Sequence, residues 1–163
     1  MRACASRTFV EVGGNRGAVV GDAGSSFCKT VGGDTGGVSS AATCPLPRSG
    51  MRRLHLPASS NVRYQYVGLA AAGKDISKDE RIYKDKDVWL MSCDTGGLCC
   101  GGEWLGARGR VDAGSVITVE WDQTRVNFLK NGVLHGEMPN AAMPGAVKLV
   151  VSLAYKDNSV LLL

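Results

Sequence analysis

The sequence lacks the apolar segments that cross membranes or direct secretion. No window approaches the roughly 18 apolar residues of a membrane-spanning helix, and the first ten residues contain no apolar core of signal-peptide length. The sequence also lacks an acceptor for N-linked glycans, because Asn158-Ser159 is followed by Val160. We therefore expect a cytoplasmic or otherwise intracellular protein that contacts no membrane.

Groups that commonly carry out catalysis are also scarce. His55 and His135 are the only imidazoles, and no Gly-x-Ser-x-Gly nucleophile elbow is present. Lys29-Thr30 lacks the preceding glycine-bounded loop that cradles phosphate. Asp-Thr-Gly occurs twice, at Asp34 and Asp94, but Asp34 follows two glycines rather than an apolar strand, which favours two unrelated turns over an aspartic protease dyad. We expect a protein that is not an enzyme and that uses no cofactor.

Metal-ligand spacing is missing as well. Cys93, Cys99 and Cys100 lack the two-residue spacing of zinc knuckles, and both histidines are distant in sequence, so we expect no metal site. The six cysteines could form three disulfides, but a chain of this length can bury a core without cross-links. Reduced and mostly buried thiols are the interpretation that the sequence favours.

What the sequence does contain is glycine and a normal share of apolar residues. Glycine accounts for 22 of 163 residues, about twice the usual share, which favours many turns. Apolar residues make up 44% and charged residues 21%, as in ordinary globular chains. This length suits a single domain spanning residues 1–163. The net charge of +4 is too small to indicate nucleic acid by itself.

The clearest periodicity is the two-residue alternation of β-strands. In residues 115–122, Ile117, Val119 and Trp121 share one face while polar residues occupy the other. Asn131-Gly132 supplies the residues that a tight hairpin turn prefers. Short strands at such intervals predict an all-β fold, either a sandwich or a barrel. Strands are expected at residues 8–12, 18–20, 51–56, 64–72, 88–93, 115–122, 125–130, 133–135, 147–154 and 159–163.

Two segments are expected to be surface loops. Residues 32–47 are rich in Gly, Ser, Thr and Ala and poor in bulky side chains, which is typical of a mobile loop. Residues 74–87 alternate in charge sign and contain Ile76, Ile82 and Tyr83. For this second segment a solvated loop is favoured over a short helix.

From Tyr66 onward the order of motifs resembles a SPRY domain. The family reads Val-Gly-Val-Ala, then Gly-Asp-Val-Ile, Phe-x-Lys-Asn-Gly and Pro-x-Val-Ser-Leu. The resemblance is specific in residues 112–163 and near Tyr66, and it is loose in residues 1–60. Ser115 replaces the usual Asp, and the Ser-Trp-Gly element is not reproduced in residues 88–104. The matching segments here are Tyr66-Val67-Gly68-Leu69-Ala70, Gly114-Ser115-Val116-Ile117, Phe128-Leu129-Lys130-Asn131-Gly132 and Leu149-Val150-Val151-Ser152-Leu153.

The resemblance implies a bent, two-layer antiparallel β-sandwich of the concanavalin-like SPRY type, with long loops and little helix. It also implies a non-catalytic module that binds a peptide or protein segment through its edge loops, as an adaptor or as part of a larger regulatory protein. The family's binding loops map to residues 74–87 and 155–158. Within them we expect Arg81, Tyr83, Tyr155 and Lys156 to contact the partner, because exposed Tyr and Arg are common at contact centres.

Other functions remain as alternatives. A carbohydrate-binding, lectin-like sandwich shares the two-sheet layout and would show exposed aromatics or a calcium-ligand loop. A hydrolase would need converging acid and base groups, which the sequence does not reveal. A nucleic-acid-binding module is less favoured than the lectin-like alternative, because alternation places the arginines on the solvent face of strands. The nucleic-acid alternative rests on four arginines near Tyr64 and Tyr66, which are Arg48, Arg52, Arg53 and Arg63.

Overall fold

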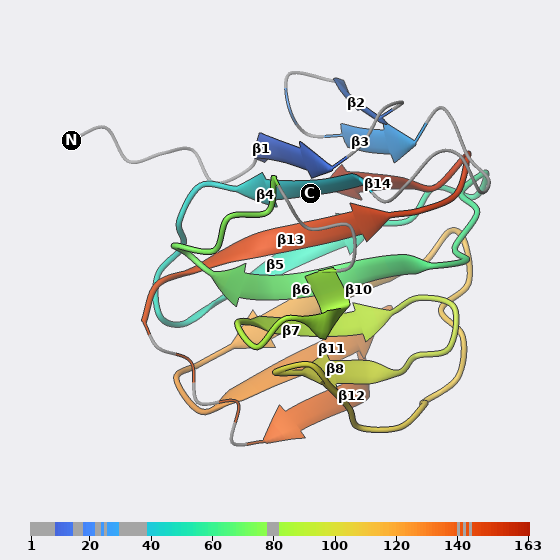
Figure 1. The fold of residues 1–163 in the computed structure, drawn as a ribbon. Helices are drawn as coiled ribbons and strands as arrows, with labels where there is room; N and C mark the ends of the chain where they lie inside the picture. Colours follow the sequence, from blue (N-terminus) through green and yellow to red (C-terminus); the bar gives the residue numbers. More distant parts are fainter. Residues whose placement is uncertain are drawn as a thin grey trace.

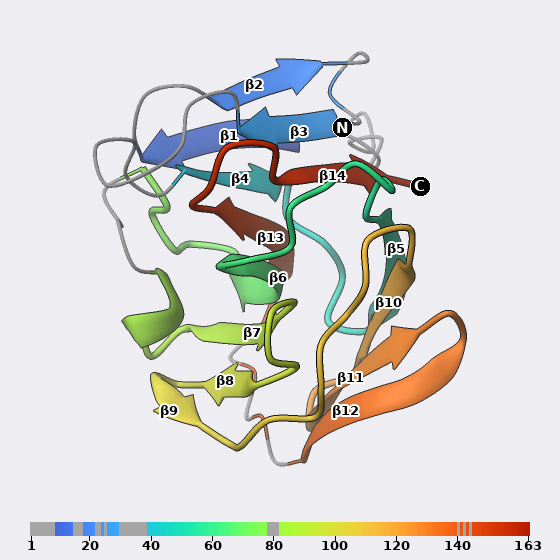
Figure 2. The ribbon, with the colours of Figure 1, turned by 90° about the vertical axis from the view of Figure 1, so that its right-hand side faces the viewer.

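The computed structural model describes residues 9–14, 18–21, 24, 26–29, 39–77, 82–139, 141, 143 and 145–163. These residues form two seven-stranded antiparallel sheets that face each other as a β-sandwich (Figures 1 and 2). The first sheet has the order β1 (Phe9–Gly14), β4 (Ser39–Thr43), β13 (Val147–Leu153), β6 (Gln65–Ala71), β7 (Val88–Ser92), β8 (Leu98–Cys100) and β9 (Glu103–Trp104). The second has the order β12 (Val133–Pro139), β11 (Arg125–Lys130), β10 (Val116–Trp121), β5 (Gly50–His55), β14 (Ser159–Leu162), β3 (Ser26–Lys29) and β2 (Ala18–Gly21).

The main core lies between the sheets and confirms the predicted alternation. Ile117 and Val119 of β10 are fully buried, and their polar neighbours Thr118 and Glu120 lie on the other face. Each fully buried aliphatic or aromatic side chain contributes about 1.5–3 kcal/mol relative to exposure. Other core members from both sheets are Phe27, Leu54, Val67, Leu69, Val126, Phe128, Val147, Leu149, Val151 and Val160.

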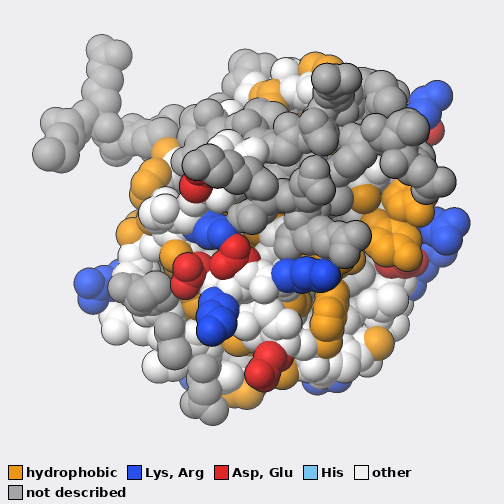
Figure 3. Space-filling view, in the orientation of Figure 1, with side chains coloured by type: hydrophobic (Ala, Val, Ile, Leu, Met, Phe, Trp, Pro, Cys, Tyr) orange, Lys and Arg blue, Asp and Glu red, His pale blue; other side chains and the backbone are white. Residues whose placement is uncertain are grey.

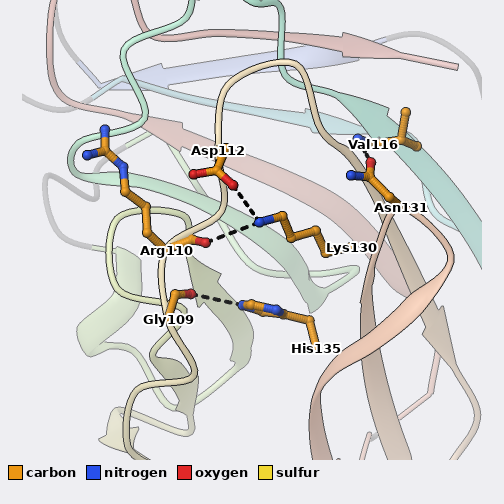
Figure 4. Close-up of polar contacts among 7 residues, drawn as sticks. All are labelled: Gly109, Arg110, Asp112, Val116, Lys130, Asn131 and His135. Atoms are coloured by element: carbon orange, nitrogen blue, oxygen red, sulfur yellow. Dashed lines mark hydrogen bonds and ion pairs between the residues drawn. The ribbon is translucent and has the colours of Figure 1, made fainter.

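The predicted hairpin at Asn131-Gly132 is present. Both residues have positive φ angles, 50° and 82°, which is the backbone that a two-residue turn between strands requires. The Asn131 Oδ1 atom also accepts a hydrogen bond of 2.9 Å from the Val116 amide (Figure 4). The turn therefore fixes the register of β11 against β12 and ties the hairpin to β10.

The first sheet is covered on its outer face as well, which corrects the expectation of a solvated loop at residues 74–87. Ile76 and Ile82 from this segment are fully buried and join a second apolar cluster with Ala70, Val88 and Leu90. The short 3-10 helix η2 (Ile82–Lys84) lies in front of β6 and β7 (Figure 1). Because both faces of β6 and β7 are buried, their sequences are apolar almost throughout rather than alternating.

A second correction concerns residues 32–47, which we expected to form a mobile loop. Ser39–Thr43 is strand β4, whose five residues are all buried between β1 and β13. Ala41 belongs to the core between the sheets and Ala42 to the outer apolar cluster, so both faces of β4 are covered. A strand that is covered on both faces shows no polar and apolar alternation. Residues 32–38 of that predicted loop lie outside the described residues. Strands β3, β8 and β9 were not expected either.

The cysteines agree with the expectation only in part. Cys93 and Cys99 are buried free thiols, and Cys28 and Cys100 are partly exposed free thiols. Cys44 is disulfide-bonded, so the expectation of reduced thiols throughout is wrong at this position. Disulfides are rare in reducing compartments, so this bond bears on the expected intracellular location, which subcellular fractionation would test.

Over the described part of the chain, no helix has the length and apolar character needed to cross a bilayer.

Candidate docking surface

Three aromatic rings meet on the outer face of the first sheet. Tyr66 projects outward from the beginning of β6, and its ring stacks on Tyr83 of η2 with 5.0 Å between centroids. Trp104 of β9 closes the group at 6.2 Å from Tyr66 and 5.9 Å from Tyr83. Tyr66 is buried, whereas the Trp104 side chain is 48% exposed. Tyr66 therefore lies on the buried side of this group, next to the sheet, and Trp104 presents apolar area to solvent.

A second aromatic pair stands beside this group. Tyr64 stacks on Tyr155 with 5.3 Å between centroids, and the Arg63 guanidinium lies 5.7 Å from the Tyr155 ring centroid. Tyr64 has a φ of 49°, a left-handed conformation that is uncommon for a large side chain. Tyr64 is 48% exposed. We call Tyr64, Tyr66, Tyr83, Trp104 and Tyr155 the aromatic surface; Figure 3 shows hydrophobic side chains beside Lys and Arg over the beginning of β6.

A cavity of about 290 Å³ connects the two groups of rings. Its walls are Tyr64, Tyr66 and Trp104, and polar groups enter from Ser92, Asp94 and Thr95 in and after β7. Burial raises the pKa of Tyr66 far above its ordinary value, with smaller contributions from Tyr83, Tyr64 and Asp94, so its hydroxyl stays protonated at neutral pH. The cavity thus combines apolar walls with a hydroxyl, a threonine and a carboxylate.

Asn158 holds the two loops that carry Tyr64 and Tyr155. Its Oδ1 atom accepts hydrogen bonds from the amides of Ala154 (3.1 Å) and Tyr155 (2.7 Å). Its Nδ2 group donates to the carbonyls of Asn61 and Arg63. Because Asn158 is fully buried, these four bonds join the turn between β13 and β14 to the loop before β6.

Ser60 and Gln65 extend this buried polar network. The Ser60 hydroxyl and the Gln65 amide nitrogen both donate to the Ser159 carbonyl, each over 3.1 Å. The Ser159 amide in turn donates to the Ser60 hydroxyl over 3.0 Å. Networks of satisfied buried polar groups hold one geometry, so the Tyr64–Tyr155 stack rests on a fixed base.

Lys74 and Asp85 tie the segment that carries Tyr83. Their side chains form an ion pair across the segment, and the Ala71 amide donates to the Asp87 carbonyl over 2.9 Å at its base. Burial alone would raise the pKa of Asp85, but the hydrogen bond and charge of Lys74, with the amides of Asp87 and Lys86, lower it below its ordinary value. Asp85 is therefore ionised and paired at neutral pH.

The loop between β9 and β10 is bonded to the β11–β12 hairpin on one side (Figure 4) and to Thr95 of the cavity lining on the other. The Gly109 amide donates to the Thr95 carbonyl over 3.0 Å, and His135 Nε2 lies 3.0 Å from the Gly109 carbonyl. Lys130 pairs with Asp112 at 2.6 Å and lowers the pKa of that carboxyl. These contacts attach the turn containing Asp94 and Thr95 to the β11–β12 hairpin.

The structure brings together only some of the residues expected from the sequence. Tyr83 and Tyr155 both belong to the aromatic surface, and Lys156 is exposed in the turn next to Tyr155. Arg81 lies outside the described residues. Sequence reasoning did not assign Tyr64, Tyr66 or Trp104 to a protein-binding site. A signal existed in the neighbouring Arg63, Tyr64 and Tyr66, which the sequence analysis considered only for nucleic acid.

Comparisons with known proteins support the fold. Neither a protein-family model nor a curated protein sequence matches the chain. Among solved structures, the SPRY domain of human HERC1 is similar with a TM-score of 0.72 and 16% identity, over 89% of this chain and 91% of that one. A human SPRY domain matches with a TM-score of 0.72 and 20% identity, over 91% and 96% of the two chains. The TRIM65 PSpry domain matches with a TM-score of 0.67 and 13% identity, over 96% and 90%.

The chain therefore has the fold of a SPRY domain, as the sequence motifs predicted. Within the described ranges, no group of three His, Cys, Asp or Glu side chains is arranged to hold a metal ion.

Proposed function

We propose that this protein is a non-catalytic interaction module that docks a segment of another protein on the aromatic surface. The observation that carries the proposal is the partly exposed pair Tyr64 and Trp104 at the rim of a 290 Å³ cavity. Tyrosine, tryptophan and arginine are the residues that most often dominate binding energy at protein interfaces. The same arrangement supports a role as an adaptor or as part of a larger regulatory protein.

The dimensions and chemistry of the cavity favour a peptide side chain as its occupant. Its volume is near the lower end of the range for small-molecule sites, which suits one or two side chains. An apolar anchor would contact Tyr64 and Trp104, and Asp94 with Thr95 would bond to the neighbouring peptide backbone. Because the rings are already stacked and the loops already bonded, little ordering would accompany binding.

A carbohydrate is the second candidate, because the structure has the exposed aromatic group that this alternative requires. Sugar rings and peptide side chains can both lie against Trp104 and Tyr64. The described residues offer no calcium-ligand cluster of the kind some lectins use. We therefore rank a protein segment first and include glycans as a separate arm of the test.

The proposal can be tested with a displayed library of random peptides selected on the full chain. We expect selected peptides to lose roughly tenfold or more in affinity for the Tyr64→Ala, Tyr155→Ala double variant. The Val133→Ala, Leu134→Ala double variant is the matched control, since it removes exposed apolar side chains from the other sheet. Undiminished binding to the tyrosine variant would contradict the proposal. Binding of a glycan array but of no peptide would favour the carbohydrate alternative.

A further inference from the structure

The outer face of the second sheet carries a groove that is separate from the aromatic surface. A cavity of about 340 Å³ lies over Met51, Glu120 and Asn127, and a second of about 190 Å³ lies beside Glu137. Arg125 lines both cavities, so they adjoin. None of these residues contributes to the aromatic surface or to the polar network beneath it.

Strand register places four of these side chains in one row. Glu120 of β10 pairs with Met51 of β5 on one side and with Asn127 of β11 on the other. Asn127 in turn pairs with Glu137 of β12. Val119, which precedes Glu120 in β10, is buried in the core, so the row faces outward. Adjacent members are therefore separated by about 4.7–4.9 Å, the spacing of neighbouring strands.

Among the described residues, the oxygen acceptors of this row have no hydrogen-bond donor or ion-pair partner. Glu120 and Glu137 make no ion pair or side-chain hydrogen bond with any residue that the structure describes. The Asn127 Oδ1 atom is buried and also has no hydrogen-bond partner within the described chain. An unpaired buried acceptor is unfavourable, and each such group in a folded protein calls for an explanation.

The other charges near the groove are already occupied or lie outside it. Asp122 accepts hydrogen bonds from Thr124 and from the Arg125 amide, and its second oxygen lies 3.3 Å from Arg125 Nε. Arg53 is on the same face but in the next row, opposite Thr118. The charged residues that line the two cavities are Glu120, Asp122, Glu137 and Arg125, with a net charge of −2. The Arg52 guanidinium lies at the edge of the groove, where its Nη1 atom donates to the Met51 carbonyl over 2.7 Å.

We propose that the Glu120–Asn127–Glu137 row binds the guanidinium group of an arginine in a partner protein segment. A guanidinium offers five N–H donors in one plane, which suits a line of three acceptors across neighbouring strands. The two free carboxylates supply the charge, and Asn127 Oδ1 gains the donor that it lacks. Met51, which is 51% exposed, would contact the aliphatic part of the arginine side chain.

The proposal is tested by NMR titration of the full chain with the blocked pentapeptide Gly-Gly-Arg-Gly-Gly and its lysine and citrulline analogues. We expect saturable shifts at the amides of Met51, Glu120 and Asn127 with the arginine peptide. The lysine peptide should bind more weakly, and the uncharged citrulline peptide should produce no saturable shift. Shifts spread over the whole surface, or equal binding of citrulline, would overturn the proposal.

Variants that remove charges distinguish binding at the row from a general effect of negative charge on peptide affinity. Glu120→Gln with Glu137→Gln should weaken the arginine peptide by roughly tenfold or more, whereas Asp87→Asn with Glu103→Gln, a matched loss of two charges on the first sheet, should not. Asn127→Asp adds a carboxylate of the same shape and should tighten binding. Equal affinity across all of these proteins would refute the inference. This titration does not involve the aromatic surface, so a negative result would leave the proposed function untouched.

Discussion

Replacing Asn158 with alanine should damage both the stability and the docking geometry of this protein. Asn158 is fully buried, and its side chain makes four hydrogen bonds that join the loop before β6 to the turn after β13. The alanine removes all four and leaves two amides and two carbonyls without that partner. No other single side chain among the described residues links Tyr64 and Tyr155 through so many bonds.

The expected loss can be worked from these contacts. A net hydrogen bond contributes about 1 kcal/mol, and an unsatisfied buried group costs about 1–3 kcal/mol. Water can reach part of this region, so we expect a loss of about 3 kcal/mol in the free energy of unfolding. With a urea m-value of about 2 kcal/mol/M, the midpoint should fall by about 1.5 M.

Urea unfolding followed by tryptophan fluorescence checks the prediction. Asn61→Ala is the matched control, because its side chain makes one exposed hydrogen bond, to the Arg63 amide at 3.1 Å, and the loss should be about 1 kcal/mol or less. Asn158→Asp should be destabilised most at neutral pH, where a carboxylate would face two carbonyls, and should recover stability as acidification protonates it. A loss below about 1 kcal/mol for Asn158→Ala would refute the reasoning.

Three further predictions follow from other contacts. Asp85→Asn should be less stable than the wild type at neutral pH. The difference in unfolding free energy should begin to shrink as pH falls below about 3.9, the ordinary pKa of an unfolded Asp, and should disappear only once pH is below the lowered pKa of Asp85 in the folded protein. The Gly68→Ala variant should lose about 3 kcal/mol or more in the free energy of unfolding, because its Cβ atom would lie 2.1 Å from the Trp89 carbonyl oxygen. Thermal or urea unfolding measures this loss. The Gly73→Ala control, whose Cβ atom would meet open space, should lose little. Alkylation followed by mass spectrometry should modify Cys28 and Cys100 in the folded protein but Cys93 and Cys99 only after unfolding, because both are buried and burial raises the pKa of Cys99 to about 11.

Local sequence patterns predicted the strands whose two faces differ. Residues 116–121 alternate because one face meets the core and the other meets solvent, and Asn131-Gly132 specifies its turn through backbone preference alone. Strand β4 escaped prediction because both of its faces are covered. Its Ser, Ala and Thr residues then carry no periodic signal, and their small size resembles the composition of a loop.

The candidate site was predictable only where a family motif placed it. Tyr83 and Tyr155 follow from the positions of the family's binding loops. Tyr64 does not, because its loop has a left-handed φ at this residue and is held by Asn158, whose contact with the Asn61 carbonyl spans 97 residues of sequence. A contact of that range has no local signature. The same is true of the row on the second sheet, where Glu120 and Glu137 are brought into line by strand pairing.

The two proposed surfaces should act independently, and the reason lies in their construction. The aromatic surface is built from the outer side of the first sheet and the loops beside it, and the Glu120–Asn127–Glu137 row lies on the outer face of the second sheet. The two sheets face each other, with the main core between them (Figure 2). Close-packed sheets resist small displacements, and neither surface needs a loop to move before it can bind. The arginine peptide should therefore bind with the same affinity, within about twofold, whether or not a selected peptide saturates the aromatic surface. A larger change would mean that the core transmits strain between the sheets, and the description of both surfaces as preformed would then be wrong.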